Sequence, residues 1–166
     1  MPGKPTNFGS PQEFVEALWP HAQEAAAELG MDPKMLLAQA ALESGWGRAM
    51  AKAADGRDSH NLFGIKADRS WQGRSIAMPT LEYEDGVAVK RRAAFRSYDS
   101  FADSFRDYVG FLKANPRYTK ALENADNPQR FIASLQKAGY ATDPNYARKV
   151  LSIYQGHSAF EGLNLG

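Results

Sequence analysis

The chain of 166 residues is long enough for one domain with a substantial hydrophobic core. Its 20 basic and 19 acidic residues nearly cancel, which excludes a general attraction to nucleic acid or to an anionic membrane surface. It contains no cysteine, so disulfides and thiol catalysis are excluded, and no apolar run approaches the roughly 20 residues that span a bilayer.

Both ends of the chain have the composition of a linker. Residues 1–9 are polar and contain proline and glycine, and residues 157–166 form a polar tail. We therefore expect a disordered linker over 1–9, one domain over 10–156 and a tail over 157–166. Because no apolar stretch follows the first lysine, no secretory signal is visible. The chain is expected either to be exported by another route or to be a fragment.

Capping residues followed by proline predict four helix starts. The pairs are Ser10–Pro11, Asp32–Pro33, Asn127–Pro128 and Asp143–Pro144. In the first helix, Ser10 and Glu13 form a capping box, an apolar stripe follows, and Gly30 provides the exit. The second helix, over about 33–43, is apolar nearly all round, which is typical of a central helix that other helices surround.

The pattern changes after the second helix. An Asp85–Gly86 turn lies between two segments of strand-like composition, which predicts a β-hairpin. The remaining helices are expected at about 101–113, 119–123, 128–138 and 144–154. Ser100 is the expected cap of the first of these. The expected fold is mainly α with a small β-hairpin lobe, in which a helical body surrounds a buried central helix.

Glu43 is the first candidate for chemistry. It lies in the last turn of the predicted central helix, where burial and the negative end of the helix dipole both disfavour the ionised form. A raised pKa is what a general acid needs to hold a proton near neutral pH. Gly45, Trp46 and Gly47 follow directly and predict the floor of a cleft, with Trp46 as a surface for sugar rings. The alternative is that Glu43 is a solvated helix-terminal residue and Trp46 is ordinary core.

Four blocks of the sequence together resemble one family of enzymes. They are AQAALESGWG at 38–47, HNLFGIKA at 60–67, TLEYEDG at 80–86 with AAFRSYDSFADSFRDYVGFL at 93–112, and GYATDPNYARKV at 139–150. In this order they resemble the lysozyme-like N-acetylglucosaminidases of glycoside hydrolase family seventy-three, over residues 14–154. The resemblance implies an α+β lysozyme-like fold with a substrate groove between the helical body and the hairpin lobe.

The resemblance also implies catalytic roles. Glu43 matches the proton donor of the family, and Glu82 matches the second carboxylate, which acts as base for a water or stabilises the cationic transition state. Glu84 is the rival for that second role, because residues two apart on a strand share a face. The alternative for both hairpin glutamates is that they are solvated charges. Tyr140 matches a family tyrosine that orients water or stabilises developing charge. Tyr146 is the alternative for this role, although it begins the apolar stripe of the last helix, which favours a place in the core.

Further residues of the four blocks are expected to bind the glycan. Asn61 can hydrogen-bond an acetamido or hydroxyl group, and Gly64 lets the glycan approach the backbone. For Phe63 the alternative is core packing. The full set of expected substrate-binding residues is Ser44, Trp46, Asn61, Phe63, Gly64 and Tyr146.

Other kinds of function have less support in the sequence. The three histidines are scattered, which speaks against a metal site, and no cofactor is implied. Serine is not presented in a G-x-S-x-G turn. The basic run KRRAAFR at 90–96 could contact nucleic acid, but a solvated strand or contact with acidic wall peptides fits the balanced charge better.

Two further functions stay open at this point. A lytic transglycosylase shares the fold and the single glutamate, although Glu82 argues against it, and a non-catalytic murein-binding module would have lost the chemistry. The resemblance further implies peptidoglycan strands as partner and a periplasmic location. Flagellum-associated members carry a separate N-terminal part that contacts rod proteins, which suggests flagellar rod proteins as partners. We expect a monomer without membrane insertion.

Overall fold

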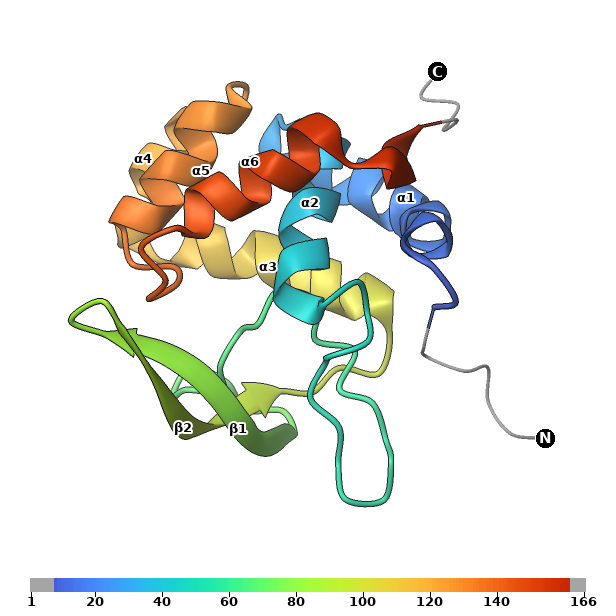
Figure 1. The fold of residues 1–166 in the computed structure, drawn as a ribbon, viewed down its shortest axis with the longest axis vertical. Helices are drawn as coiled ribbons and strands as arrows, with labels where there is room; N and C mark the ends of the chain where they lie inside the picture. The colour runs from blue at the N-terminus through green and yellow to red at the C-terminus, as the bar shows by residue number, and fades with distance from the viewer. Residues whose placement is uncertain (1–7, 162–166) are drawn as a thin grey trace.

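The computed structural model describes residues 8–161, in which six α-helices form a body and a two-stranded sheet forms a lobe beside it (Figure 1). The elements are α1 (Pro11–Leu29), α2 (Pro33–Ser44), β1 (Ser75–Glu84), β2 (Val87–Arg96), α3 (Phe101–Ala114), α4 (Thr119–Glu123), α5 (Pro128–Lys137) and α6 (Tyr146–Gly156), with 3₁₀ turns at Pro116–Tyr118 and Ser158–Phe160. The predicted mainly helical fold with a hairpin lobe is confirmed. No helix within 8–161 combines the length and the apolar character needed to cross a membrane.

Local capping chemistry accounts for most helix starts. The side chains of Ser10, Asp32 and Asn127 each accept a hydrogen bond from a backbone N–H in the first turn of α1, α2 and α5, and a proline follows each cap. The fourth predicted pair differs, because α6 begins at Tyr146 rather than at residue 144. There Asp143 accepts from the N–H of Asn145 at 2.8 Å, so the chain makes a tight turn before the helix.

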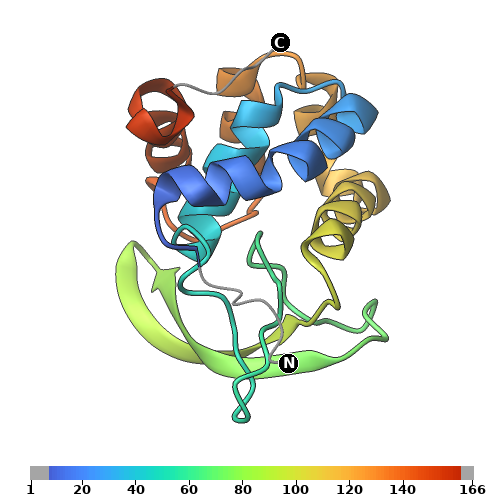
Figure 2. The same ribbon diagram turned by 90° about the vertical axis from the view of Figure 1, so that its right-hand side faces the viewer.

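The second helix is central, as its apolar sequence predicts. It packs against α1 on one side and α6 on another, and Figure 2 shows α1 crossing it. Its buried residues lie on all sides of the helix: Met35, Leu36, Leu37, Ala38, Gln39, Ala40, Ala41 and Ser44. Glu43 is in the last turn of this buried helix, at the end that faces the hairpin.

The hairpin is closed by the predicted turn. Asp85 and Gly86 have φ angles of 52° and 79°, which is the geometry of a type I′ turn and matches the twist of the two strands. The register pairs Glu84 with Val87 and Glu82 with Val89. Exposure alternates along most of β1, which is the pattern of a strand with one face turned to the body.

Arg96 anchors the hairpin to the body. Its side chain is almost fully buried, and its guanidinium binds Asp107 of α3 at 3.0 Å and the backbone oxygen of Lys66 at 3.1 Å. The segment 65–67 also hydrogen-bonds to β2, through Arg96 and Ala94. These contacts place Lys66 beside the hairpin, on the side that faces α2.

The folded body extends beyond the predicted limits of 10 and 156. At the start, the ring of Phe8 packs edge-on against Phe14 with 5.3 Å between centroids. At the end, His157 lies against Trp46, and Phe160 is only 6% exposed. The predicted linker and tail are therefore corrected at these positions, because their aromatic residues cover the apolar surface near α1. The rest of that prediction, 1–7 and 162–166, lies outside the described residues.

Candidate active site

A groove of about 590 Å³ lies between the helical body and the hairpin lobe. Its walls come from the end of α2, the inward face of β1, the segment 139–143 and the start of α6. Two of the lining residues are Glu43 and Glu82. The groove therefore brings together the two carboxyls that the sequence singled out, from different lobes of the molecule.

Burial raises the pKa of Glu43 from its usual value of 4.5 to about 7. This pKa is the net result of four contributions: a hydrogen bond from Tyr146 and the charge of Lys66 lower it, and the negative charge of Glu82 adds to the effect of burial. Gly64, with φ of 64°, lies directly over the carboxyl, and a Cβ at this position would collide with its Oε2. The predicted raised pKa thus has burial as its main cause.

A chain of buried hydrogen bonds lies behind Glu43. The amide of Gln39 donates to the hydroxyl of Tyr146 at 2.9 Å, and its oxygen accepts from the hydroxyl of Tyr108. Because the Tyr146 oxygen accepts from Gln39, its own proton is directed to Glu43, with which it forms a hydrogen bond. Tyr146 thus contacts the Glu43 carboxyl as well as lining the groove.

Glu82 is in the opposite electrostatic state. Burial acts to raise the pKa of its carboxyl, but hydrogen bonds from Lys66 and Thr142, together with the Lys66 charge, outweigh it and hold the pKa below its usual value. Thr142 Oγ1 donates to Oε2 of Glu82 at 2.8 Å, and Lys66 Nζ forms an ion pair with Oε1. Glu82 is therefore ionised at neutral pH, where Glu43 still holds much of its proton.

Glu84 has a different partner from Glu82. Its carboxylate accepts two hydrogen bonds from the guanidinium of Arg91, at 2.8 and 2.9 Å, and it is about half exposed. It does not line the groove. The geometry therefore favours Glu82 over Glu84 as the second carboxylate. The Arg91 contact also shows that part of the basic run 90–96 is neutralised within the hairpin.

Tyr140 lies in the wall of the groove after α5. Gly139, with φ of 85°, ends that helix and turns the chain inward. The Tyr140 hydroxyl donates to the backbone oxygen of Phe63 at 2.7 Å, and burial raises its pKa well above 10. The phenol is therefore neutral, with its proton committed to the protein and its oxygen still able to accept a hydrogen bond.

Three of the expected substrate-binding residues do not line the groove. Ser44 is fully buried, and its hydroxyl bonds to the backbone of Ala40 and Gly47. Phe63 is fully buried and stacks on Tyr108 with 4.0 Å between ring centroids. Trp46 packs against other aromatic rings near α1. In this structure Ser44 and Phe63 serve loop shape and packing, and Trp46 lies outside the groove, so direct binding of glycan by these three residues stays a prediction.

Asn61 reaches the edge of the groove but is only 4% exposed. Its amide nitrogen donates to the backbone oxygens of Ile65 and Arg96, both at 2.9 Å, and its oxygen accepts from the N–H of Ile65. Because both donor hydrogens are used inside the protein, Asn61 fixes the loop that carries Gly64 and Lys66. Its expected hydrogen bond to an acetamido or hydroxyl group of the glycan stays a prediction, and the amide hydrogens that could donate to it are already used within the protein.

The sequence argument missed Gln39, Lys66 and Thr142. All three lie inside the blocks that carry the resemblance, but their roles depend on partners far away in the chain. Gln39 did give a signal, since it is the polar residue on an otherwise apolar buried helix and needs a hydrogen-bond partner there. Lys66 and Thr142 gave none, because exposed lysines and threonines are common.

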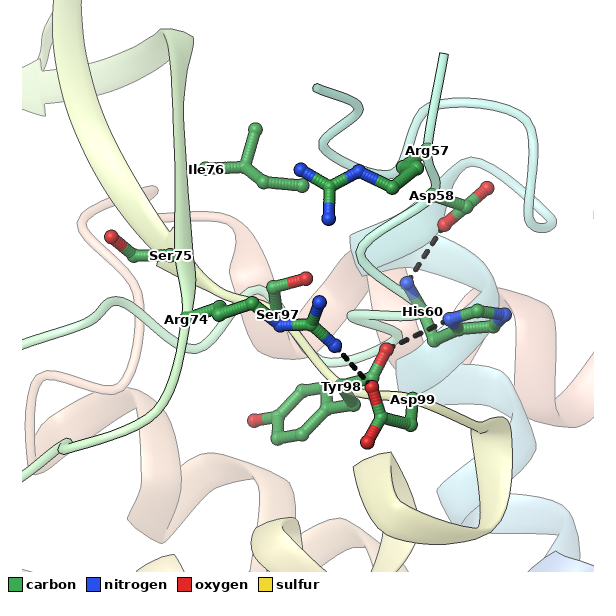
Figure 3. Close-up of a pocket in the computed structure, with 9 residues that line it drawn as sticks. All are labelled: Arg57, Asp58, His60, Arg74, Ser75, Ile76, Ser97, Tyr98 and Asp99. Atoms are coloured by element: carbon green, nitrogen blue, oxygen red, sulfur yellow. Dashed lines mark hydrogen bonds and ion pairs between the residues drawn. The ribbon is translucent and has the colours of Figure 1, made fainter. Parts of the chain in front are cut away.

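A second hollow, of about 390 Å³, lies at the base of the hairpin (Figure 3). Its polar groups bind one another: Arg74 pairs with Asp99, and His60 donates from Nδ1 to the backbone oxygen of Tyr98 at 2.9 Å. Asp58 accepts from the N–H of His60 at 2.8 Å. Within residues 8–161, no three His, Asp or Glu side chains lie together as metal ligands would. The hydrogen bonds in the wall of this hollow stabilise the loop at 51–60. Its lining residues include no pair of carboxyls like Glu43 and Glu82.

Comparison with known proteins identifies the family of this chain. The sequence model of the glucosaminidase family, described as mannosyl-glycoprotein endo-beta-N-acetylglucosaminidase, matches residues 19–159. The peptidoglycan hydrolase FlgJ of Vibrio cholerae is 57% identical over 148 residues, which cover 89% of this chain and 44% of that protein. FlgJ of Pseudomonas aeruginosa is 53% identical over 156 residues, covering 94% and 39%. The chain thus spans less than half the length of these relatives.

A solved structure matches the fold over most of both chains. The crystal structure of a peptidoglycan hydrolase mutant from Sphingomonas sp. A1 has a TM-score of 0.84 and 42% identity, and the match covers 89% of this chain and 95% of that one. The family match, the sequence relatives and the shared fold lead to one conclusion. The chain belongs to the glucosaminidase family of glycoside hydrolases.

Proposed function

We propose that this chain hydrolyses the β-1,4 bond between N-acetylglucosamine and N-acetylmuramic acid in peptidoglycan. The observation that carries the proposal is the pair of carboxyls in one groove, with the pKa of Glu43 raised to about 7 and that of Glu82 held below its usual value. Two carboxyls in opposite protonation states are what glycoside hydrolysis requires. The names of the relatives support peptidoglycan as the substrate.

Each carboxyl has a separate task in the reaction. Glu43 donates its proton to the departing glycosidic oxygen, and the hydrogen bond from Tyr146 keeps the carboxyl oriented. Glu82 acts on the other side of the bond, where it activates a water or stabilises the positive charge of the oxocarbenium-like transition state. Lys66 and Thr142 keep this carboxylate ionised and aimed. No metal takes part in this scheme.

Tyr140 supports the water or the charge at the reacting carbon. Its proton is used by the backbone oxygen of Phe63, so its oxygen offers lone pairs to a water in the groove. Gly64 leaves space above the Glu43 carboxyl, so a sugar can approach the acid without meeting a side chain. We propose that these two residues and Tyr146 form the wall nearest to the bond that is cleaved.

The cellular context follows from the relatives named FlgJ. We propose that the chain acts on peptidoglycan in the bacterial periplasm and opens the wall for the flagellar rod. Contact with flagellar rod proteins would then need a region outside this chain, in keeping with its partial coverage of those relatives. We propose that the chain works as a monomer, since the groove is built from one copy.

Clearing of a murein suspension, followed by mass spectrometry of the products, tests the proposed function. The wild type should clear murein and release new reducing ends on N-acetylglucosamine. Glu43→Gln should reduce the rate by at least about 1,000-fold, because no other acid is placed to donate the proton. Glu82→Gln should reduce it by about 10- to 1,000-fold.

Glu84→Gln is the matched control, because it removes a carboxylate two residues away that lies outside the groove. It should clear murein at nearly the wild-type rate. Equal clearing by Glu43→Gln and the wild type would overturn the assignment of the acid. Anhydro-muramyl product ends would identify a lytic transglycosylase instead, and a wild type that binds murein without cleaving it would identify a binding module.

A further inference from the structure

The hydroxyl of Thr142 joins the two lobes across the groove. Thr142 belongs to the segment between α5 and α6, which approaches the tip of the hairpin in Figure 1. Its Oγ1 donates to Oε2 of Glu82 at 2.8 Å and accepts from the backbone N–H of Tyr83 at 2.9 Å. One side chain of the body therefore contacts both the carboxylate and the backbone of β1.

The bond to Tyr83 satisfies an open edge of the sheet. In a two-stranded antiparallel sheet, every second N–H points away from the partner strand. Glu84 and Val87 flank the two-residue turn and form a hydrogen-bonded pair, so the N–H of Tyr83, one residue further, points outward. Thr142 supplies the acceptor that this N–H would otherwise seek in water.

The two bonds also fix the direction of the hydroxyl proton. A threonine hydroxyl has one proton, and its oxygen has lone pairs that accept. Because the backbone N–H of Tyr83 can only donate, the oxygen must accept there, and the proton is left for Glu82. The strand and the carboxylate that it carries are thus held at the same atom, so a shift of the hairpin would break both bonds together.

We propose that Thr142 is a positioning residue, which locks the hairpin against the body and sets the place of the Glu82 carboxylate relative to Glu43. The inference rests on the proposed function, and it adds a residue that contributes through Glu82 and not by touching the reacting bond. Lys66 alone cannot fix this geometry, because its ammonium group sits on a flexible four-carbon chain and has no preferred direction.

The charged groups around Glu82 come from both lobes. Lys66 pairs with its Oε1, and Glu43 faces it across the groove. Lys149 and Asp143, on the same wall as Thr142, are paired with each other. Replacing Thr142 by valine removes a hydroxyl but changes none of these charges, and valine has nearly the same shape as threonine. A change in the pKa or the position of the Glu82 carboxylate can then be attributed to the lost hydrogen bonds.

Kinetics of Thr142→Val on soluble glycan strands tests the inference. The variant should lose about 10- to 100-fold in kcat with a much smaller change in KM, because the carboxylate is displaced while the groove remains. The acidic limb of its pH profile should move to higher pH, since Glu82 loses a donor that stabilises its ionised form. Thr142→Ser keeps the hydroxyl and should restore both properties.

Amide hydrogen exchange at Tyr83 provides a readout that does not depend on activity. It should be faster in Thr142→Val than in the wild type and Thr142→Ser, because its acceptor is missing. Wild-type exchange in the valine variant overturns the inference whatever the activity. Faster exchange with unchanged kcat and pH profile also overturns it, since the contact would then be structural only. Failure of the proposed function is distinct, because the wild type itself would not cleave murein.

Discussion

At the scale of single residues, the burial that suits Glu43 to donate a proton also lowers the stability of the folded protein at neutral pH. A carboxyl whose pKa is higher in the folded state than in the unfolded state lowers the free energy of unfolding at any pH where the unfolded chain has lost the proton. Below the unfolded pKa of 4.5 both states carry the proton, and the group has no effect. Between pH 4.5 and about 7 the folded state keeps the proton that the unfolded state has lost, so the free energy of unfolding falls by roughly 3 kcal/mol and stays at this lower level above pH 7.

Glu43→Gln should therefore be more stable than the wild type at pH 8 and similar to it at pH 4. Glutamine has nearly the same shape and avoids the buried charge, so the free energy of unfolding should rise by about 1–3 kcal/mol at the higher pH. Urea unfolding at both pH values measures this difference, with Glu84→Gln as the exposed control. A gain that is equal at pH 4 and pH 8 would contradict the pKa of about 7.

The residues of the site differ in how well the sequence predicts them. The place of Glu43 could be predicted, because it ends a helix that is apolar nearly all round, while its catalytic role came only from the resemblance. Asn61 and Phe63 belong to the same quoted block as Gly64, yet the structure uses them inside the protein. A motif shows which residues are near a site, but the direction of a side chain depends on loop geometry that the sequence does not give.

At the scale of elements, the helices and the hairpin follow from local signals. A cap followed by proline, or an Asp–Gly turn between strands, involves neighbouring residues only, so these elements could be predicted closely. The predicted start of α6 at residue 144 was wrong, and the helix begins at Tyr146. Asp143 binds Lys149 and the N–H of Asn145, and these contacts stabilise a turn where the first helical residues were expected. The attachment of the hairpin was not predictable, since Arg96 looked like one of several exposed basic residues.

Arg96 should contribute much more to stability than its neighbours in the basic run. Its side chain is almost fully buried, and its guanidinium binds Asp107 and Ser70 and lies over the ring of Trp71 at 5.0 Å. Arg96→Met should lower the free energy of unfolding by about 3 kcal/mol, because it leaves the largely buried Asp107 carboxylate without its cationic partner, with the Tyr98 hydroxyl still donating to it. Chemical denaturation checks this value.

Arg92→Met is the matched control for that experiment, since Arg92 is an exposed arginine of the same strand. It should change the free energy of unfolding by less than about 0.5 kcal/mol. Equal losses in the two variants would show that Arg96 does not anchor the hairpin. Murein clearing by Arg96→Met should fall as well, because Lys66 and the hairpin both depend on this anchor.

At the scale of the whole molecule, the site depends on distant parts of the chain meeting in one groove. Glu43 ends α2, Glu82 is near the hairpin tip, and Thr142 precedes α6. The sequence could name the first two, but it could not show that they share a groove or that Thr142 connects the lobes. Such contacts depend on how the helices pack around α2, and no local pattern encodes that arrangement.

Titration of Glu43 in the folded protein tests the central claim most directly. Carbon-13 labelling of the glutamate carboxyls, with Glu43→Gln to assign the resonance, allows its protonation to be followed by NMR between pH 3 and pH 9. We predict a midpoint near pH 7, well separated from the other glutamates. A midpoint near the usual value of 4.5 would mean that the carboxyl carries no proton at neutral pH and cannot act as the acid.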